Sequence, residues 1–257
     1  MSEKPSRRPP PRLYSEASLS AGEPMVLTMA QAHYLRSVLR LNEGAPVVVF
    51  NGRDGEWLAY LEVARGSGGW LRPEVQTRPQ SGGGGPWLLF APLKKDATDF
   101  VVEKAVELGV GRLCPVMTRR TQTQTVRVDR LRAQAVEAAE QCERLDVPEV
   151  EAARPLPEVL AQWPAGRHLC ILGERRQGVE ARAAFEALRG QPVAFLVGPE
   201  GGLDDRDLDG AAQLASCTVD LGPRILRAET AAAAVLAVWQ AVAGDWGPLS
   251  PAPLASF

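Results

Sequence analysis

The stretch Val193-Ala-Phe-Leu-Val-Gly-Pro-Glu-Gly-Gly202 joins five apolar residues directly to a glycine-rich turn. A short apolar run bounded by turn residues is typical of a strand buried on both faces, as in a parallel sheet. Glycines after such a strand let backbone groups approach a ligand closely, although a tight turn into a helix uses them equally well. Ligands of open α/β sheets bind beyond the carboxyl ends of the strands. The stretch therefore predicts a parallel sheet and a candidate binding edge.

Two further apolar runs end in the same way. His168–Leu172 is followed by Gly173-Glu174-Arg175-Arg176, and Cys217–Leu221 by Gly222-Pro-Arg-Ile-Leu-Arg-Ala-Glu-Thr230. The sequence has neither a G-x-G-x-x-G motif after its first parallel strand nor a G-x-x-x-x-G-K-[ST] motif, so dinucleotide-binding and P-loop enzymes are disfavoured. Three converging glycine loops instead predict a pocket of main-chain groups that is suited to an adenosine.

Strands and helices alternate on either side of these loops. Strands are predicted at residues 87–91, 112–114, 168–172, 193–197 and 217–221, and helices at 98–109, 129–145, 179–189, 204–215 and 228–243. This alternation is typical of an α/β domain with a mostly parallel sheet.

The first third of the chain has a different pattern. Short strands are predicted at 25–28, 47–50, 57–63 and 70–72, interrupted by a helix at 30–41 that Thr28 caps. The linker Ser81-Gly-Gly-Gly-Gly-Pro86 separates this part from the rest. We therefore expect a basic, proline-rich arm at 1–12, a small β-barrel domain at 13–80 and an α/β domain at 86–247.

Composition narrows the function classes. The 257 residues carry a formal net charge of −2, and no apolar run has the length of a membrane span. No secretory signal is apparent, so we expect a cytoplasmic protein without membrane contact. The four cysteines, which are widely spaced, and the two isolated histidines argue against a metal site, so metal-free chemistry is expected.

Longer motifs carry a resemblance to a known family. Gly198-Pro-Glu-Gly-Gly202 and Leu221-Gly-Pro-Arg-Ile-Leu-Arg-Ala-Glu-Thr-Ala231 closely resemble the ribosomal RNA small subunit methyltransferase E family of the SPOUT superfamily. The chain departs from the family pattern at Asp207, where a glutamate is expected, and at Ala228, which is often threonine. The similarity covers roughly residues 12 to 243, and it extends to these further segments: Arg12-Leu-Tyr14, His33–Arg40, Lys94-Lys-Asp96, Glu103–Gly109, Ala138–Arg144 and Val147-Pro-Glu149.

The resemblance implies a PUA-like RNA-binding barrel, followed by a SPOUT methyltransferase domain with a C-terminal trefoil knot. It also implies S-adenosylmethionine as cofactor, a homodimer formed through the C-terminal helix, and N3-methylation of a uridine in the decoding region of 16S ribosomal RNA within the 30S subunit. The residues expected to bind the cofactor are Leu172, Gly173, Glu174, Val197, Gly198, Pro199, Glu200, Gly201, Gly202, Leu221, Gly222, Ile225, Leu226 and Thr230. Those expected to bind RNA are Arg12, Arg36, Arg40, Lys94, Gln141 and Arg144.

The implied reaction requires the proton on N3 of uracil to leave. Arg224 and Arg227 follow a predicted strand end, and guanidinium groups suit two carbonyl oxygens or a phosphate. Glu229 could accept the proton, or it could simply complement the dipole of the helix that begins there. We therefore take Arg224, Arg227 and Glu229 as the candidate catalytic residues.

Two alternatives stay open. A relative in the same superfamily that methylates a ribose 2′-hydroxyl would share the fold and its loops. A non-catalytic RNA-binding assembly factor could also retain the fold, although an intact set of three loops argues against it.

Overall fold

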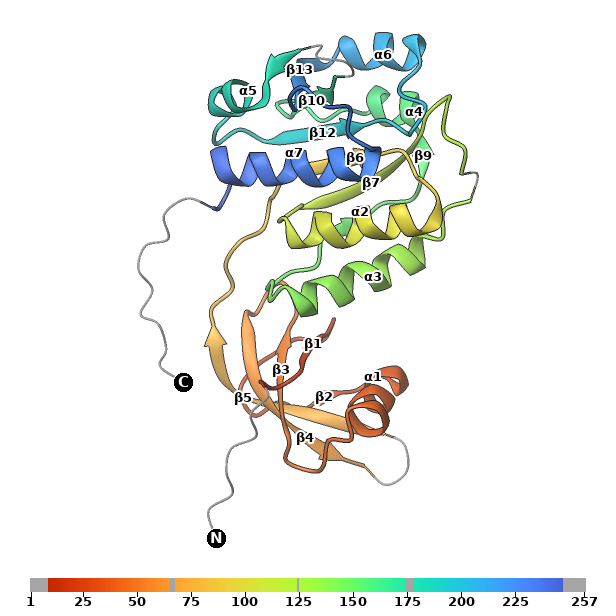
Figure 1. The fold of residues 1–257 in the computed structure, drawn as a ribbon. Helices are drawn as coiled ribbons and strands as arrows, with labels where there is room; N and C mark the ends of the chain where they lie inside the picture. The colour runs from red at the N-terminus through yellow and green to blue at the C-terminus, as the bar shows by residue number, and fades with distance from the viewer. Residues whose placement is uncertain (1–8, 65–67, 124, 174–177, 247–257) are drawn as a thin grey trace. The chain divides into compact units, whose positions relative to one another are not determined.

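The computed structural model describes residues 9–64, 68–123, 125–173 and 178–246. Its chain divides into two compact units (Figure 1). The first comprises residues 1–83 together with 139–147, and the second comprises 84–138 together with 148–257. Glu174 and the expected arm up to residue 8 lie outside the described residues.

The first unit is a five-stranded sheet with one short helical segment. The sheet order is β1-β3-β4-β5-β2, in which β1 and β3 are parallel and the remaining neighbours are antiparallel. Alternate strand residues meet in a single apolar core with Ala32 and Leu35 from the helical segment. The elements are β1 (Arg12–Tyr14), β2 (Met25–Val26), α1 (Met29–His33), a π-helix (Tyr34–Val38), β3 (Pro46–Phe50), β4 (Glu56–Val63) and β5 (Gly69–Arg78).

The helix predicted at 30–41 is present but is not a uniform α-helix. Thr28 caps it as predicted, because its side chain accepts a hydrogen bond from the Gln31 amide and Gln31 bonds back to the Thr28 amide. From Tyr34 the backbone widens into a π-helix, and Arg40 ends the segment with a φ of 56°.

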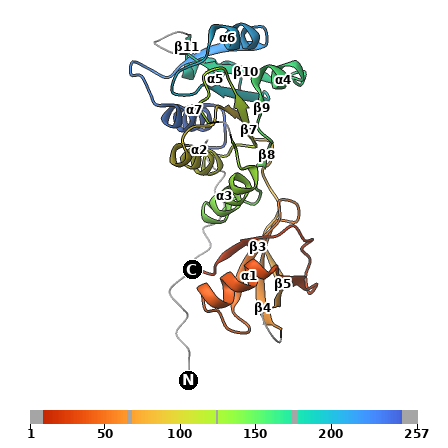
Figure 2. The same ribbon diagram turned by 90° about the vertical axis from the view of Figure 1, so that its right-hand side faces the viewer.

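The second unit is a three-layer α/β domain, which confirms the expected mostly parallel sheet (Figures 1 and 2). All its strand pairs are parallel, in the order β11-β13-β10-β12-β6-β7-β8, and β9 adds to β7. Its strands are β6 (Trp87–Phe90), β7 (Arg112–Met117), β8 (Glu149–Val150), β9 (Arg154–Pro155), β10 (His168–Leu172), β11 (Val179–Glu180), β12 (Val193–Val197) and β13 (Ala215–Asp220). Its helices are α2 (Lys95–Glu107), α3 (Val128–Gln141, whose last residues belong to the first unit), α4 (Leu156–Ala161), α5 (Ala181–Ala187), α6 (Asp205–Ala212) and α7 (Ala228–Val242).

Two helical layers bury the two faces of this sheet. On one face α7 contacts α2, α5 and β12, and the rings of Phe185, Phe195 and Trp239 pack edge to face with centroids 5.4 to 5.7 Å apart. On the other face α4 and α6 pack together over a second apolar cluster.

Among the described residues, no helix is long and apolar enough to traverse a bilayer. The trefoil knot implied by the resemblance stays a prediction.

Gln240 is a buried polar residue on the otherwise apolar α7, with 4% of its surface exposed. Its Nε2 donates to the Leu108 carbonyl at 2.8 Å, and its Oε1 accepts from the Asp245 amide at 2.9 Å. The side chain therefore ties the end of α2 to the chain that follows α7.

Replacing Gln240 with leucine should lower the free energy of unfolding by about 2 kcal/mol, because the partly buried Leu108 carbonyl and the Asp245 amide both lose a side-chain partner. Urea unfolding followed by circular dichroism measures the change. The exposed Gln191 provides the matched control, Gln191→Leu. Equal effects of the two substitutions would show that the Gln240 side chain contributes no more than a surface residue.

Candidate cofactor and substrate site

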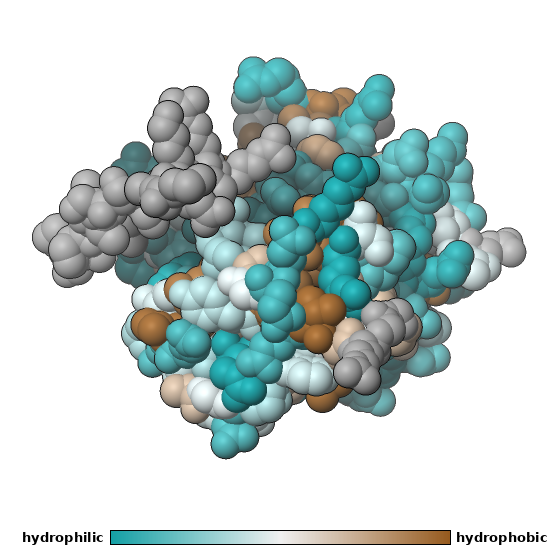
Figure 3. Space-filling model, turned by 90° about the horizontal axis from the view of Figure 1, so that it is seen from below, coloured by the Kyte–Doolittle hydropathy of each residue, from teal (hydrophilic) through white to brown (hydrophobic). Residues whose placement is uncertain are grey.

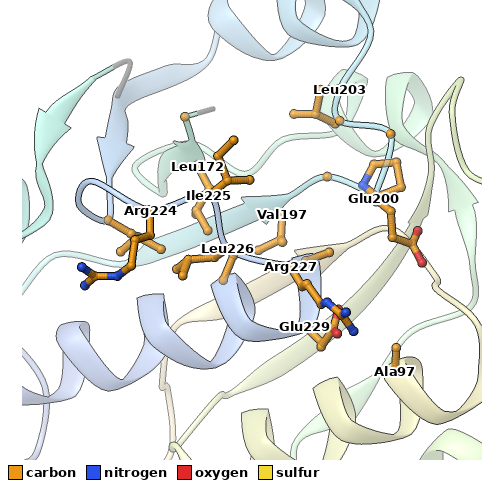
Figure 4. A pocket seen from close by; sticks show the side chains of 18 of the residues that line it. Ala97, Leu172, Val197, Glu200, Leu203, Arg224, Ile225, Leu226, Arg227 and Glu229 are labelled. Carbon is orange, nitrogen blue, oxygen red and sulfur yellow. The ribbon is translucent and has the colours of Figure 1, made fainter. Parts of the chain in front are cut away.

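A cavity of about 830 Å³ opens at the carboxyl ends of β10, β12 and β13, where the sequence placed the binding edge (Figure 4). Three loops form most of its wall, and the start of α2 and the loop after β7 complete it. Its lining residues are Lys94, Ala97, Arg120, Leu172, Gly173, Val197–Leu203, Asp220–Glu229 and Ala231.

Most of the residues expected to bind the cofactor come together in this cavity. Twelve of the fourteen line it, whereas Thr230 is exposed and absent from the lining, and Glu174 is outside the described residues. The three candidate catalytic residues and Lys94 line the same cavity. The geometry thus groups residues that stand more than a hundred positions apart in the chain.

The sequence missed some wall residues, of which Arg120 is the most informative. It stands in the loop after β7, a strand that the sequence predicted to end at residue 114 but that continues to Met117. Had the strand been predicted at its full length, Arg119 and Arg120 would have been recognised as further residues at the carboxyl edge.

Glycine backbones shape the wall. Gly202 and Gly222 have φ values of 74° and 106°, which residues with a side chain rarely adopt. A Cβ added to Gly198 would lie 3.0 Å from the Leu203 side chain. Hydrogen bonds also fix the backbone of two loops. The Gly173 amide donates to the Val219 carbonyl, and the Gly222 amide donates to the Asp220 carboxylate. The loops therefore hold defined shapes that larger residues would disturb.

Apolar and charged groups occupy different parts of the cavity. Leu172, Val197 and Leu226 lie along the inner wall, and Ile225 is 86% exposed in the same loop (Figure 4). Arg227 and Glu229 both line the cavity, and in Figure 4 they appear on the side that also carries Glu200 and Ala97. Arg224 points away from them, at the other side of the loop (Figure 4). The arrangement offers an apolar slot with Arg224 and Arg227 at two separate positions.

Some of the residues expected to bind RNA are exposed, and others bond to groups within the protein. Lys94 precedes α2 and is exposed at the cavity, and Arg40 and Gln141 are exposed in the first unit. Arg36 is half-buried and donates to the Gly68 carbonyl. The predicted contacts of these residues with RNA stay predictions.

Arg12 and Arg144 have structural partners that the sequence did not predict. The Arg12 guanidinium, only 11% exposed, pairs with Glu56, donates to the Arg144 carbonyl at 2.7 Å and lies over the Phe50 ring. The Arg144 guanidinium bonds to Asp146 at 3.0 Å. The Arg12 side chain therefore fastens segment 139–147 to β1, and the Arg144 side chain bonds within that segment, so their predicted role in RNA binding has a structural alternative.

A metal site is not apparent in the part of the chain that the structure describes, where no three histidine, cysteine or acidic residues form a ligand group.

Three cysteines lie within the sheet. Cys170 and Cys217 face each other on β10 and β13 with their sulfur atoms 3.4 Å apart. Cys114 is buried, and burial raises its pKa to about 12.

Two family models match this chain. Residues 86–240 match the model of an RNA methyltransferase domain family, and residues 27–69 match that of an RNA methyltransferase PUA domain.

Named relatives and solved structures extend the match to nearly the whole chain. A ribosomal RNA small subunit methyltransferase E of Rickettsia conorii is 29% identical over 88% of this chain and 93% of its own length. The corresponding protein of a Synechocystis species is 31% identical over 83% of this chain and 71% of its own. The structure of the Neisseria gonorrhoeae protein of the same name, bound to S-adenosylmethionine, is 28% identical with a TM-score of 0.81, covering 92% of this chain and 99% of its own. A putative methyltransferase of Legionella pneumophila, in complex with the same cofactor, is 25% identical with a TM-score of 0.81, covering 91% and 98% of the two chains. This chain belongs to the ribosomal RNA small subunit methyltransferase E family.

Proposed function

We propose that this protein transfers the methyl group of S-adenosylmethionine to N3 of a uridine in 16S ribosomal RNA, with the small ribosomal subunit as substrate. The observation that carries the proposal is one cavity of the described residues, in which three glycine loops meet Arg224, Arg227 and Glu229. A ribosomal substrate would also place the enzyme in the cytoplasm.

The cavity wall fits the proposed cofactor. Exposed main-chain groups of the glycine loops suit the edge of an adenine, and Leu172, Val197 and Leu226 suit its faces. The positive-φ glycines leave room that a Cβ would reduce. When bound, S-adenosylmethionine supplies an activated methyl carbon on a sulfonium.

The candidate catalytic residues supply what the uracil requires. N3 of uracil reacts only after it loses its proton, and the resulting negative charge spreads over O2, N3 and O4. Arg227 lines the cavity with donors suited to that charge, and Glu229, which lines the same cavity, is the candidate proton acceptor. Glu229 also lies in the first turn of α7, where a carboxylate complements the helix dipole whether or not it accepts a proton. Arg224, on the other side of the loop, is suited to a phosphate of the RNA.

The first unit supplies a second surface for RNA. Seen from below, its hydrophobic surface forms small patches within a largely hydrophilic face (Figure 3). Met29, Tyr34 and Val38 are exposed on the helical segment that also carries Arg36 and Arg40. Aromatic and guanidinium groups together are typical of surfaces that stack on unpaired bases.

We also propose a homodimer through α7, which the outer face of this helix supports. Val235, Leu236 and Trp239 face the core of the unit. The opposite face bears small apolar residues that are partly or fully exposed: Ala233, Ala234, Ala237, Val238 and Ala241. An apolar face of this kind suits a symmetric contact with a second copy. Light scattering tests it, and a monomer at working concentration would contradict it.

Methyl transfer from labelled S-adenosylmethionine to small subunits that lack the modification tests the proposal directly. Nucleoside mass spectrometry should identify N3-methyluridine at one position. A 2′-O-methyl nucleoside would retain the fold but assign the ribose-methylating alternative. Cofactor binding without transfer to subunits or free RNA would contradict the proposed substrate, and no cofactor binding would favour the non-catalytic RNA-binding alternative.

A further inference from the structure

The loop that follows β7 forms a tight turn beside the cavity. The Thr118 amide donates to the Thr121 hydroxyl at 2.9 Å, and the Thr121 amide returns to the Thr118 carbonyl at 3.2 Å. Arg119 and Arg120 stand between these threonines. We call residues Thr118 to Thr121 the 118–121 turn. Its two hydrogen bonds fix the backbone that carries the two arginines.

A buried carboxylate holds one side of this turn. Asp207 lies in the first turn of α6, is 4% exposed, and accepts the Arg119 amide at 3.1 Å. A buried carboxylate is costly unless it is hydrogen-bonded, and the start of a helix further stabilises its charge. Because the donor is a main-chain amide, this contact does not depend on the side chain of Arg119.

Arg120 holds the other side. Its Nη1 donates to the Gly201 carbonyl at 2.8 Å, while its guanidinium lies 3.9 Å from the Asp204 carboxylate. Asp204 in turn caps α6 by accepting the Arg206 amide. Arg120 thus holds Gly201, in the loop at 198–202. The two residues that flank Gly201, Glu200 and Gly202, line the cavity.

We infer that Asp207 and Arg120 are positioning residues, which fasten the 118–121 turn to the loop at 198–202 so that this wall of the cavity is formed before the cofactor arrives. The inference rests on the proposed function, since it takes S-adenosylmethionine as the occupant. A loop held in its bound shape loses less conformational entropy on binding, so affinity rises without a new contact to the ligand.

The inference predicts a particular pattern of loss. The two residues act on the wall and not on the transferred methyl group, so S-adenosylmethionine and its demethylated product should be affected equally. KM for the cofactor should rise, while kcat at saturation should change little.

The experiment is calorimetric titration of the full-length protein with S-adenosylhomocysteine, together with hydrogen exchange of residues 198–204. Arg120→Met keeps the aliphatic stem but removes the donors, and it should weaken binding about tenfold and speed exchange of the loop. Arg120→Lys retains one donor and should recover part of the loss. Arg119→Met is the matched control, because it removes the cation that lies 3.7 Å from Asp204 yet leaves the amide that Asp207 binds and the bond from Arg120 to the Gly201 carbonyl.

The second anchor is tested by Asp207→Ala, which removes the acceptor, beside Asp207→Asn, which retains a carbonyl oxygen. Should the buried Asp207→Ala variant fail to fold, Arg120→Met still decides the matter, because the Arg120 side chain is 50% exposed. Wild-type protein that does not bind S-adenosylhomocysteine would contradict the proposed function. Wild-type protein that binds it, with Arg120→Met equal in affinity and exchange, would overturn this inference alone.

Discussion

Replacing Arg227 with methionine should lower the rate of methyl transfer to small ribosomal subunits by about 100-fold, while the Kd for S-adenosylhomocysteine changes by less than about threefold. Arg227 precedes α7 and lines the cavity, as Glu229 does (Figure 4). Its guanidinium can donate to a uracil oxygen that gains charge as N3 loses its proton. Donors aimed at a developing charge act mainly on the transition state, so their loss lowers kcat and leaves cofactor binding nearly intact.

The pH dependence of this variant separates charge stabilisation from a role in folding. A higher pH ionises more uracil without help from the protein, so the rate of Arg227→Met should rise more steeply with pH than that of the wild type. Arg206→Met is the matched control, since Arg206 is exposed on α6 and is not among the cavity-lining residues. A rate within about threefold of the control at every pH would remove Arg227 from the catalytic residues.

Glu229→Gln distinguishes the two roles of its carboxylate. Glutamine keeps the shape of the side chain but neither accepts a proton readily nor carries the charge that the helix dipole favours. A loss as large as that of Arg227→Met, with unchanged thermal stability, would assign proton acceptance to Glu229. A small loss of stability with normal transfer would leave only the helix-dipole role.

The buried strands were the most predictable part of the fold. The runs at 168–172 and 193–197 match β10 and β12 residue for residue, because short apolar segments flanked by glycine and proline leave little choice of boundary. Since the carboxyl ends of parallel strands share one edge of the sheet, predicting the strands also predicted which loops would meet. The apolar runs that predicted the buried strands therefore also predicted the loops that form the cavity wall.

Pro115 explains why β7 was predicted too short. A proline within a strand removes a donor and usually marks its end. In β7 it lies between the pairing of 112–113 with β8 and the pairing of 116–117 with β9, so the strand changes partner around it. Because the predicted strand ended three residues too early, the 118–121 turn and Arg120 were not recognised as part of the carboxyl edge.

Long-range contacts could not be predicted from local patterns. The helix predicted to run from 129 to 145 ends at Gln141, and Glu143 adopts a φ of 61°. Arg12 donates to the Arg144 carbonyl after this helix, and the Tyr14 amide donates to the Glu140 carboxylate in its last turn. Such pairs, more than 120 residues apart, have no periodic signature in either partner.

Gly222→Ala should weaken the binding of S-adenosylhomocysteine by roughly 10- to 100-fold. The φ of Gly222 is 106°, outside the regions that alanine adopts at low cost, whereas a Cβ at this position would meet no atom within 4 Å. The cost is therefore backbone strain, of roughly 1–3 kcal/mol, and not a steric clash. The loop can release the strain only by moving, and that movement displaces Leu221 and Leu226, which line the cavity.

Gly166→Ala is the matched control for this prediction, because strain alone would also lower stability. Gly166 likewise has a positive φ, of 78°, and open space around it, but it precedes β10 and is not among the cavity-lining residues. Both variants should unfold at lower temperature, and only Gly222→Ala should lose affinity for the cofactor product in calorimetry. Equal affinity in the two variants would mean that the loop at 221–226 adapts without cost, and that the wall formed by Gly198–Gly202 alone determines binding. A loss confined to Gly222→Ala would show that the backbone conformation after β13 is itself a determinant of cofactor affinity.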